Sequence, residues 1–384
     1  MTDRVIRQWP LVILGTILLL LLGFTLKPYD GNLSALFHLD TTMTNAHPFP
    51  KGFVVLQVPG YDGAQYYQIA RHLPKILQPS QWTELTTKPP SAYAYQRILL
   101  PLLAGILSLG HERALPILFP LINLLALLAT CLLLLQWKRG TSLYALALCL
   151  SPPALLALHF DLSEPLTILL LTAFLIRFLR KERIDAASIL FISLVVLSRE
   201  VNILFVLALG AWLLWERRLR EALWLLIPVL VFLGLHSLIY LIFHQIPFLW
   251  STDKSGLPLS AIWELLIGER GYNVYTLSAI ALFLSFVVPA LWIVCRQIVQ
   301  EKKRDVLTYA LGLFLGIMLC MPDHIWGSIT SIGRVITPVY PLFMIHGALH
   351  DTWLHRVTAL FVAILGLVTA IGLALIVHPS IVTP

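Results

Sequence analysis

A polar segment near the start of the chain contains residues that could act on a substrate. It reads GYDGAQYYQIARHL at residues 60–73, and its one acid is Asp62. A carboxylate can accept a proton from a substrate hydroxyl, so Asp62 is a candidate base. A helix beginning here would place Asp62, Gln65 and Tyr66 on one face, and Gln65, Tyr66 and Tyr67 could line a groove for a sugar or an acceptor. A capping role is equally open: Asp62 would cap the helix, Gln65 would complete a capping box, and the tyrosines would lie at headgroup level.

A second pair of acids, Asp161 and Glu164, follows the sequence Ser-Pro-Pro. In one interpretation Asp161 caps a helix at 165–179 and Glu164 is its capping partner. In the other, the pair adds a second acid to the site, which positions an acceptor or holds a metal ion. Two acids three residues apart are a weak metal signal by themselves, so both interpretations stand.

Three arginines could bind an anionic group: Arg199, Arg334 and Arg97. The planar guanidinium suits bidentate contact with phosphate oxygens. Each arginine also has a structural alternative. Arg199 could pair with the adjacent Glu200 at a tight turn between helices, whereas Arg334 and Arg97 could snorkel to the membrane surface. The remaining candidates for a substrate groove are Gln96 and His324, although histidines such as His159 and His324 are more often structural.

Membrane helices are the elements that must position these residues. Of the 384 residues 58% are hydrophobic and only 12% are charged, against about 25% charged in soluble domains. The apolar residues form long runs, which predict an all-α polytopic membrane protein with about 11 transmembrane helices, in a range of about 10–13. The predicted spans are 11–26, 115–136, 141–159, 165–179, 186–198, 201–215, 222–243, 273–295, 306–321, 335–350 and 357–377.

Basic residues predict which side each loop faces. The run 98–110 is short and contains Pro101, so we expect a half-helix or an interfacial helix rather than a span. With that choice, and with Arg4 and Arg7 inside, every strong basic cluster falls on the cytoplasmic side. These clusters are Trp137-Lys138-Arg139, Arg180-Lys181-Glu182-Arg183, Arg217-Arg218-Leu219-Arg220, Arg296, Lys302-Lys303-Arg304 and His355-Arg356. The candidate acids and arginines then all face the outer compartment, and the longest outer loop is the first, at 27–97, with interfacial helices.

The net charge and the cysteine content narrow the range of expected partners and of expected chemistry. In a membrane protein, a net charge of +7 bears on the orientation of the chain across the membrane and favours contact with anionic lipid. No basic patch is interleaved with aromatic residues, so we expect no nucleic-acid partner. The four cysteines lie in apolar runs without metal-site or CxxC spacing and are expected to be buried hydrophobic residues. They are Cys131, Cys149, Cys295 and Cys320.

The order of these motifs resembles the GT-C superfamily of membrane glycosyltransferases, which use polyprenyl-phosphate sugars. The sequence is most similar to a bacterial family linked to cell-surface glycopolymer formation. Two stretches carry the resemblance: Tyr61-Asp62-Gly63-Ala64-Gln65-Tyr66-Tyr67-Gln68-Ile69-Ala70 and Tyr93-Ala94-Tyr95-Gln96-Arg97-Ile98-Leu99-Leu100-Pro101-Leu102-Leu103. The resemblance covers residues 10–220 well, and within 221–384 only the region of Arg334 matches. We therefore expect one integral membrane domain over 1–384.

The resemblance implies a function. Asp62 matches the catalytic aspartate of the first outer loop, and Asp161 matches a second acid that often joins the site. Gly63 departs from members with two adjacent acids, which weakens the case for a metal there. The implied reaction transfers a sugar, with inversion, from a polyprenyl-phosphate donor to a glycan or lipid-linked acceptor. It needs no soluble cofactor and leaves a divalent metal open.

The resemblance also implies where the protein is located in the cell. The implied location is a bacterial inner membrane, among membrane lipids, with a cytoplasmic N-terminus and a site facing the periplasm or exterior.

Two rival functions stay open beside the one that the resemblance implies. A transporter should show broken helices in paired halves near the membrane midplane, and the sequence has no such halves. A non-catalytic subunit of polysaccharide assembly remains an alternative.

Overall fold

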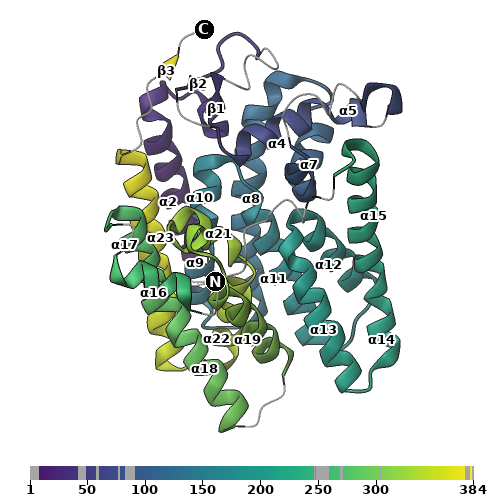
Figure 1. Ribbon diagram of the computed structural model, residues 1–384. Coiled ribbons are helices and arrows are strands. Elements are labelled where there is room, and N and C mark those ends of the chain that lie inside the picture. Colours follow the sequence, from purple (N-terminus) through teal and green to yellow (C-terminus); the bar gives the residue numbers. More distant parts are fainter. Residues whose placement is uncertain are drawn as a thin grey trace.

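The computed structural model describes residues 8–41, 49–57, 60–76, 78–82, 91–245, 247, 259–268, 271–301, 305–376 and 381–382. The described chain is an all-α membrane protein, in which long helices form a bundle and shorter elements cover one end of it (Figure 1). The predictions that concern Arg4, Arg7, the Lys302-Lys303-Arg304 cluster and the location of the N-terminus lie outside the described residues.

The bundle is formed by helices from most of the chain. They are α2 (Trp9–Leu26), α8 (Leu115–Trp137), α9 (Ser142–Cys149), α10 (Pro152–Phe160), α11 (Glu164–Lys181), α12 (Ala186–Ser198), α13 (Ile203–Trp215), α14 (Leu219–Trp224), α15 (Leu226–Phe243), α16 (Ser260–Ile267), α17 (Val274–Leu282), α18 (Val288–Val299), α19 (Val306–Leu319), α20 (Asp323–Trp326), α21 (Ile329–Val335), α22 (Val339–His350) and α23 (Trp353–Ile376). Helix α11 lies near the centre, because it packs against α8, α12, α22 and α10.

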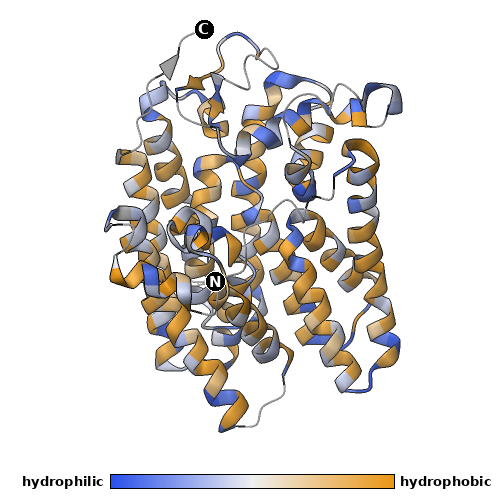
Figure 2. Ribbon diagram, in the orientation of Figure 1, coloured by the Kyte–Doolittle hydropathy of each residue, from blue (hydrophilic) through white to orange (hydrophobic). Residues whose placement is uncertain are grey.

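Six helical segments of the described chain are long and apolar enough to cross a membrane. They are Trp9–Tyr29, Glu112–Trp137, Ser142–Phe160, Leu219–Phe243, Tyr275–Val299 and Trp353–Leu375. A seventh is added if α21 and α22, which are bent by 63° at their junction, form one broken span. Their sides are mostly hydrophobic, whereas hydrophilic residues gather at the two ends of the bundle (Figure 2). The protein is therefore an integral membrane protein.

Several predicted spans are helices too short to cross unaided. The runs at 186–198, 201–215 and 306–321 form α12, α13 and α19, of 13, 13 and 14 residues. At 1.5 Å per residue they extend about 20 Å, against a hydrocarbon core of about 30 Å. The structure thus has six or seven helical segments of spanning length and composition, and the count of 11 remains a prediction.

The run 98–110 forms α7 (Leu99–Leu107), a helix of 9 residues. Its length of about 14 Å agrees with the prediction of a half-helix or interfacial helix, since it reaches less than half of the hydrocarbon core. It packs against α4 (Asp62–Arg71) and α8. Helix α7 therefore links the first loop to the bundle.

The first loop contains short elements that cover the upper end of the bundle in Figure 1. Besides α4 it has α5 (Leu73–Ile76) and short 3₁₀ turns at Lys27–Tyr29, Leu33–Phe37, Pro79–Gln81 and Ala92–Arg97. The structure adds a small sheet that the sequence did not indicate. Its strands are β1 (Leu39–Asp40), β2 (Val55–Leu56) and β3 (Ile381–Val382). Strand β2 pairs in parallel with β1 and antiparallel with β3.

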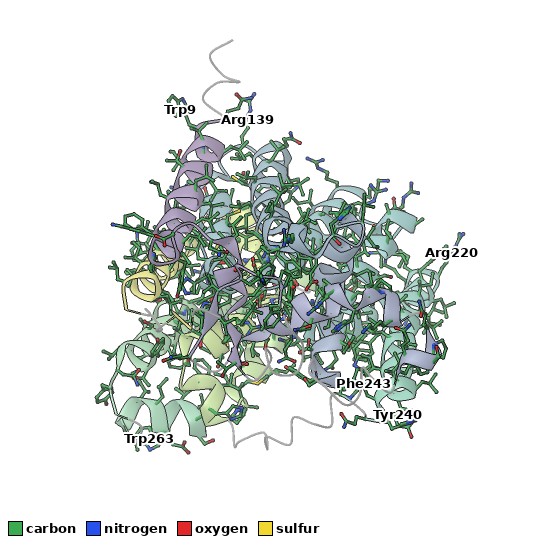
Figure 3. The ribbon with its side chains drawn as sticks, turned by 90° about the horizontal axis from the view of Figure 1, so that it is seen from above. Trp9, Arg139, Arg220, Tyr240, Phe243 and Trp263 are labelled. Carbon is green, nitrogen blue, oxygen red and sulfur yellow. The ribbon has the colours of Figure 1, made fainter. Side chains whose placement is uncertain are left out.

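Bulky side chains project from the perimeter of the bundle. Viewed from above, Trp9, Tyr240 and Trp263 lie at its edge (Figure 3) and are 58%, 49% and 64% exposed. Large exposed aromatic residues are unusual on a soluble domain but suit a surface that meets lipid.

Candidate functional site

Six charged residues from five segments meet inside the described part of the protein. We call this group the ionic cluster; it consists of Asp62, Arg97, Glu164, Arg199, Glu200 and Arg334. It joins the start of α4 and the turn at Ala92–Arg97 to the start of α11, the end of α12 and helix α21. Three acids balance three arginines, as is expected where charges are removed from water.

Asp62 is held by two arginines. Its Oδ2 atom accepts hydrogen bonds from Arg97 Nη1 at 2.9 Å and from Arg334 Nη2 at 2.7 Å. The capping prediction is wrong, because Asp62 is the first residue of α4 and the cap position belongs to Tyr61. Gln65 does not complete a capping box either: its Oε1 atom accepts a hydrogen bond from Ser91 Oγ at 3.0 Å.

Arg97 connects Asp62 to Glu200. Its Nε and Nη2 atoms donate to the two oxygens of Glu200 at 2.9 and 2.7 Å, a bidentate contact. It also donates to the hydroxyl of Tyr93, which lies four residues earlier. The arginine is buried, so the snorkelling alternative does not hold for Arg97.

Arg334 connects Asp62 to Glu164. Its Nε atom donates to Glu164 Oε1 at 2.7 Å, and its Nη1 atom donates to the hydroxyl of Tyr61 at 3.2 Å. The guanidinium also lies 5.2 Å from the centre of the Tyr61 ring, within reach of a cation–π contact. Arg334 is buried, so snorkelling is wrong for this residue as well.

Arg199 pairs with Glu164, which the chain places 35 residues away. The expected local pair between Arg199 and Glu200 is not among the contacts of the described residues, because Glu200 faces Arg97 instead. Glu164 is fully buried and accepts from two arginines, so it is not a capping partner for α11. The residue before α11, Ser163, makes no side-chain cap. Glu164 therefore positions Arg199 and Arg334.

Asp161 lies at the end of α10 and does not cap α11. Its backbone is left-handed, with φ 48°, a conformation that Asp tolerates better than most residues. Both carboxylate oxygens are buried and have no hydrogen-bond partner among the described residues. Burial raises the pKa of Asp161 well above its ordinary value.

Gly63 allows the first turn of α4 to approach the end of α10, next to Asp161. A Cβ atom at Gly63 would lie only 2.2 Å from the carbonyl oxygen of Phe160, the residue before Asp161. The ring of Phe160 also stacks on Tyr61 at 4.3 Å. The first turn of α4 therefore sits directly on the end of α10. A larger side chain at position 63, such as a second acid, therefore has no room.

The ionic cluster is accessible from outside at two of its acids, Asp62 and Glu200. The side chains of Asp62 and Glu200 are 25% and 20% exposed, whereas those of Arg97, Arg199 and Arg334 are 9% exposed or less. An incoming molecule would therefore meet Asp62 and Glu200 before it meets the arginines. Burial by itself raises the pKa of Asp62, but the charges of Arg334 and Arg97 outweigh this effect and hold the pKa below its ordinary value.

A metal ion fits this donor set poorly. Among the described residues no group of three or more His, Cys, Asp or Glu side chains could hold one. Of the two acids Asp161 and Glu164, Glu164 already binds Arg199 and Arg334, and Asp161 has no hydrogen-bond partner among the described residues.

Three other predicted site residues, Tyr66, Tyr67 and Gln96, are buried rather than lining an open groove. Tyr66 is fully buried, and its hydroxyl has no partner among the described residues. Tyr67 packs against Phe37, and its hydroxyl donates to Glu112. Gln96 is also buried. Its Oε1 atom lies 3.2 Å from His236 Nε2, and its amide donates to the carbonyl of Tyr93 at 3.2 Å.

His324 lies on the four-residue helix α20 and is exposed. None of the contacts given above for the ionic cluster includes it. Sequence reasoning missed Tyr61 and Tyr93 as partners of the arginines. The spacing of Tyr93 and Arg97, four residues apart, was a signal for that pair.

The fold and the site together define an integral membrane protein with a buried, charge-balanced ionic cluster that opens at Asp62. Comparison with protein-family models, with curated proteins and with solved structures finds no match to this chain. Any assignment of function therefore has to rest on the residues themselves.

Proposed function

We propose that the protein is a GT-C-type glycosyltransferase of the bacterial inner membrane, with a cytoplasmic N-terminus. It moves a sugar, with inversion, from a polyprenyl-phosphate donor to a glycan or lipid-linked acceptor on the outer face. The observation that carries the proposal is the geometry of Asp62. It is the partly exposed acid at the start of α4 that two buried arginines hold by one oxygen.

Asp62 acts as the base. Its lowered pKa keeps it ionised at neutral pH, as proton acceptance requires. The acceptor hydroxyl attacks the anomeric carbon and gives its proton to Asp62, while the bond from that carbon to the phosphate oxygen breaks. A single displacement of this kind inverts the anomeric centre. Negative charge then develops on the departing polyprenyl phosphate.

The arginines have two tasks in this reaction. Arg334 and Arg97 bind Asp62 in the structure, and such contacts weaken a base because they stabilise its anion. A donor phosphate would compete for the same guanidinium groups, so its arrival would release Asp62 and raise its proton affinity. Arg199, Arg334 and Arg97 would also stabilise the charge on the leaving phosphate. Donor binding thus precedes activation of the base.

The two acids after Ser-Pro-Pro have different roles in this proposal. Glu164 orients Arg199 and Arg334, since both donate to it. Asp161 has no hydrogen-bond partner among the described residues, and it would bind an acceptor hydroxyl only after a movement that uncovers its buried carboxyl group.

A non-catalytic membrane subunit is the second candidate. It is favoured by the charge balance of the ionic cluster, because every member makes at least one ion pair without any ligand. Such a network could simply join the first loop to the bundle.

The test is Asp62→Asn in cells that lack the native protein, scored by surface glycan and by the amount of protein in the membrane. Asp30→Asn is the matched control, because Asp30 is an exposed acid of the same loop. A glycosyltransferase requires that Asp62→Asn loses the glycan at a normal protein level and that Asp30→Asn keeps it. Normal glycan with Asp62→Asn would exclude Asp62 as the base and favour the subunit.

A further inference from the structure

The hydroxyl group of Tyr61 has a hydrogen-bond donor that the described part of the chain does not use. Tyr61 immediately precedes Asp62 and is half-buried. Its hydroxyl oxygen accepts a hydrogen bond from Arg334 Nη1 at 3.2 Å, and a phenol that accepts one hydrogen bond can also donate one. No acceptor for the Tyr61 proton occurs among the described residues. An incoming molecule could therefore receive this hydrogen bond.

Arg334 also has donors that the ionic cluster leaves unused. A guanidinium group carries five N–H groups. Arg334 gives one each to Glu164, Asp62 and Tyr61, through Nε, Nη2 and Nη1. One N–H on Nη1 and one on Nη2 thus have no acceptor among the described residues, although the side chain is buried. These two groups and the hydroxyl of Tyr61 are close together, because Nη1 itself binds that hydroxyl.

Packing holds the ring of Tyr61 in place. The ring stacks on Phe160, with 4.3 Å between the ring centres and an angle of 27° between the planes. The start of α4 rests on the same residue, since Gly63 lies against the carbonyl oxygen of Phe160. A ring fixed in this way loses little conformational freedom when its hydroxyl binds a ligand. Tyr61 is therefore a preorganised donor.

This set of donors suits one kind of ligand. Several N–H and O–H donors around a positive charge favour an anion that has several oxygens, as a phosphate group has. The accessible side of the ionic cluster is at Asp62, which binds Nη2 of Arg334. A phosphate that replaces Asp62 there would lie beside the hydroxyl of Tyr61, because Nη1 and Nη2 belong to one planar group.

We propose that Tyr61 donates a hydrogen bond to the phosphate group of the lipid-linked sugar donor, while Arg334 binds the same phosphate. This inference rests on the proposed glycosyltransferase function and adds a residue to its donor site. Acceptance of a hydrogen bond from Arg334 polarises the hydroxyl and makes it a stronger donor. The bond to the phosphate strengthens further as negative charge develops on the leaving group. Tyr61 keeps its proton throughout.

The experiment measures ligand binding to the purified protein in detergent by isothermal titration calorimetry. The probe is farnesyl phosphate, a short polyprenyl phosphate without a sugar, and farnesol and inorganic phosphate are the comparison ligands. Farnesyl phosphate should bind the wild type more tightly than either of them. Tyr61→Phe should weaken its binding about tenfold, because the variant loses a hydrogen bond to a charged group. Binding of farnesol should not change, since the variant keeps the ring.

Tyr240→Phe is the matched control for the loss of a phenol hydroxyl. Tyr240 is 49% exposed on α15, at the edge of the bundle (Figure 3). This variant should bind farnesyl phosphate as the wild type does. The midpoint of thermal unfolding of Tyr61→Phe is measured alongside. A purely structural role of Tyr61 would lower this midpoint and leave the preference for farnesyl phosphate over farnesol unchanged, which would overturn the inference.

The remaining outcomes separate this inference from the proposed function. Equal affinity of the wild type and Tyr61→Phe for farnesyl phosphate would overturn the role of Tyr61 and leave the proposed function, which rests on Asp62, in place. Equal binding of farnesyl phosphate and farnesol by the wild type would overturn both. Equal binding of inorganic phosphate would exclude the lipid-linked donor as the source of the phosphate. A tenfold loss in Tyr61→Phe together with normal surface glycan in Asp62→Asn would support the phosphate contact and overturn the glycosyltransferase.

Discussion

The carboxylate of Asp62 and the guanidinium of Arg334 meet at 2.7 Å although 272 residues separate them in the chain. Arg334 also holds Glu164, so one side chain from the last part of the protein joins two acids from the first half. The beginning of α4, the beginning of α11 and helix α21 are thereby fixed to each other.

Replacing Arg334 by Gln should destabilise the protein by about 3–5 kcal/mol, since it leaves buried carboxylate charge without its partner. The midpoint of thermal unfolding in detergent measures this loss. Arg334→Lys should retain part of the stability, because it keeps the charge but cannot contact both acids as a planar fork does. Arg356→Gln is the control: its partner is Asp351 in an exposed pair, and exposed pairs contribute little to stability. Equal effects at Arg334 and Arg356 would contradict a buried cluster.

Gly63→Ala should displace α4 from the end of α10. The added methyl group would lie 2.2 Å from a backbone carbonyl oxygen, which cannot rotate away as a side chain could. We expect a reduced amount of protein in the membrane and loss of any activity that depends on Asp62. Gly234→Ala is the matched control in α15, because no atom of the described residues lies within 4 Å of its added carbon. That variant should match or slightly exceed the stability of the wild type.

Asp161→Asn should increase stability and reduce activity. Burial raises the pKa of Asp161, so folding at neutral pH must protonate a carboxylate that is ionised in the unfolded chain, and an amide avoids this cost. Asn also tolerates the left-handed backbone at this position. Asp351→Asn is the control, because Asp351 has φ 47° at the end of α22 and an ion-pair partner, Arg356. Thermal unfolding and surface glycan are measured together. A fall in stability with Asp161→Asn would indicate that the carboxylate has a favourable contact.

Acidification should destabilise the wild type through Asp62. Its pKa in the folded protein lies below the unfolded value, after burial is outweighed by Arg334 and Arg97. The stabilisation is therefore fully present above the unfolded pKa of about 3.9 and is lost as the pH falls from there through the folded pKa. Denaturant unfolding of the wild type and of Asp62→Asn between pH 7 and pH 3 measures this difference. Parallel curves for the two proteins would show that the pKa of Asp62 is not lowered by folding.

The sequence predicted the helices well and the contacts between them poorly. Apolar runs located α8, α11, α12 and α13, because hydrophobic content is local information. The runs 141–159 and 222–243 each contain a break that the sequence analysis did not predict, between α9 and α10 and between α14 and α15. The caps assigned to Asp62 and Asp161 were wrong, since a distant arginine competes with the local backbone for Asp62 and a left-handed turn removes Asp161 from the start of α11. The local pair assigned to Arg199 and Glu200 failed because each residue has a partner in another segment.

The number of spans and the small sheet could not be predicted from the sequence for a second reason. Helices α12, α13 and α19 are apolar but only 13 or 14 residues long, and hydropathy alone does not decide whether helices of that length cross with the help of their neighbours. Strand β3 pairs with β2 across more than 300 residues, and two-residue strands leave no alternating pattern in the sequence. Both features depend on tertiary contacts.

The long separation of Asp62 and Arg334 has a consequence for biosynthesis. At about 5–20 residues per second, roughly 15–50 s pass between the synthesis of the two residues. During this time Arg97 is the partner available to Asp62, and Arg199 is the partner available to Glu164 once α12 has been made. The nascent chain thus carries incompletely compensated acids until α21 is added. A chain that stops before α21 would leave Asp62 and Glu164 incompletely compensated and exposed to the quality-control machinery of the cell. The synthesis of Arg334 would therefore decide whether the first loop stays packed on the bundle.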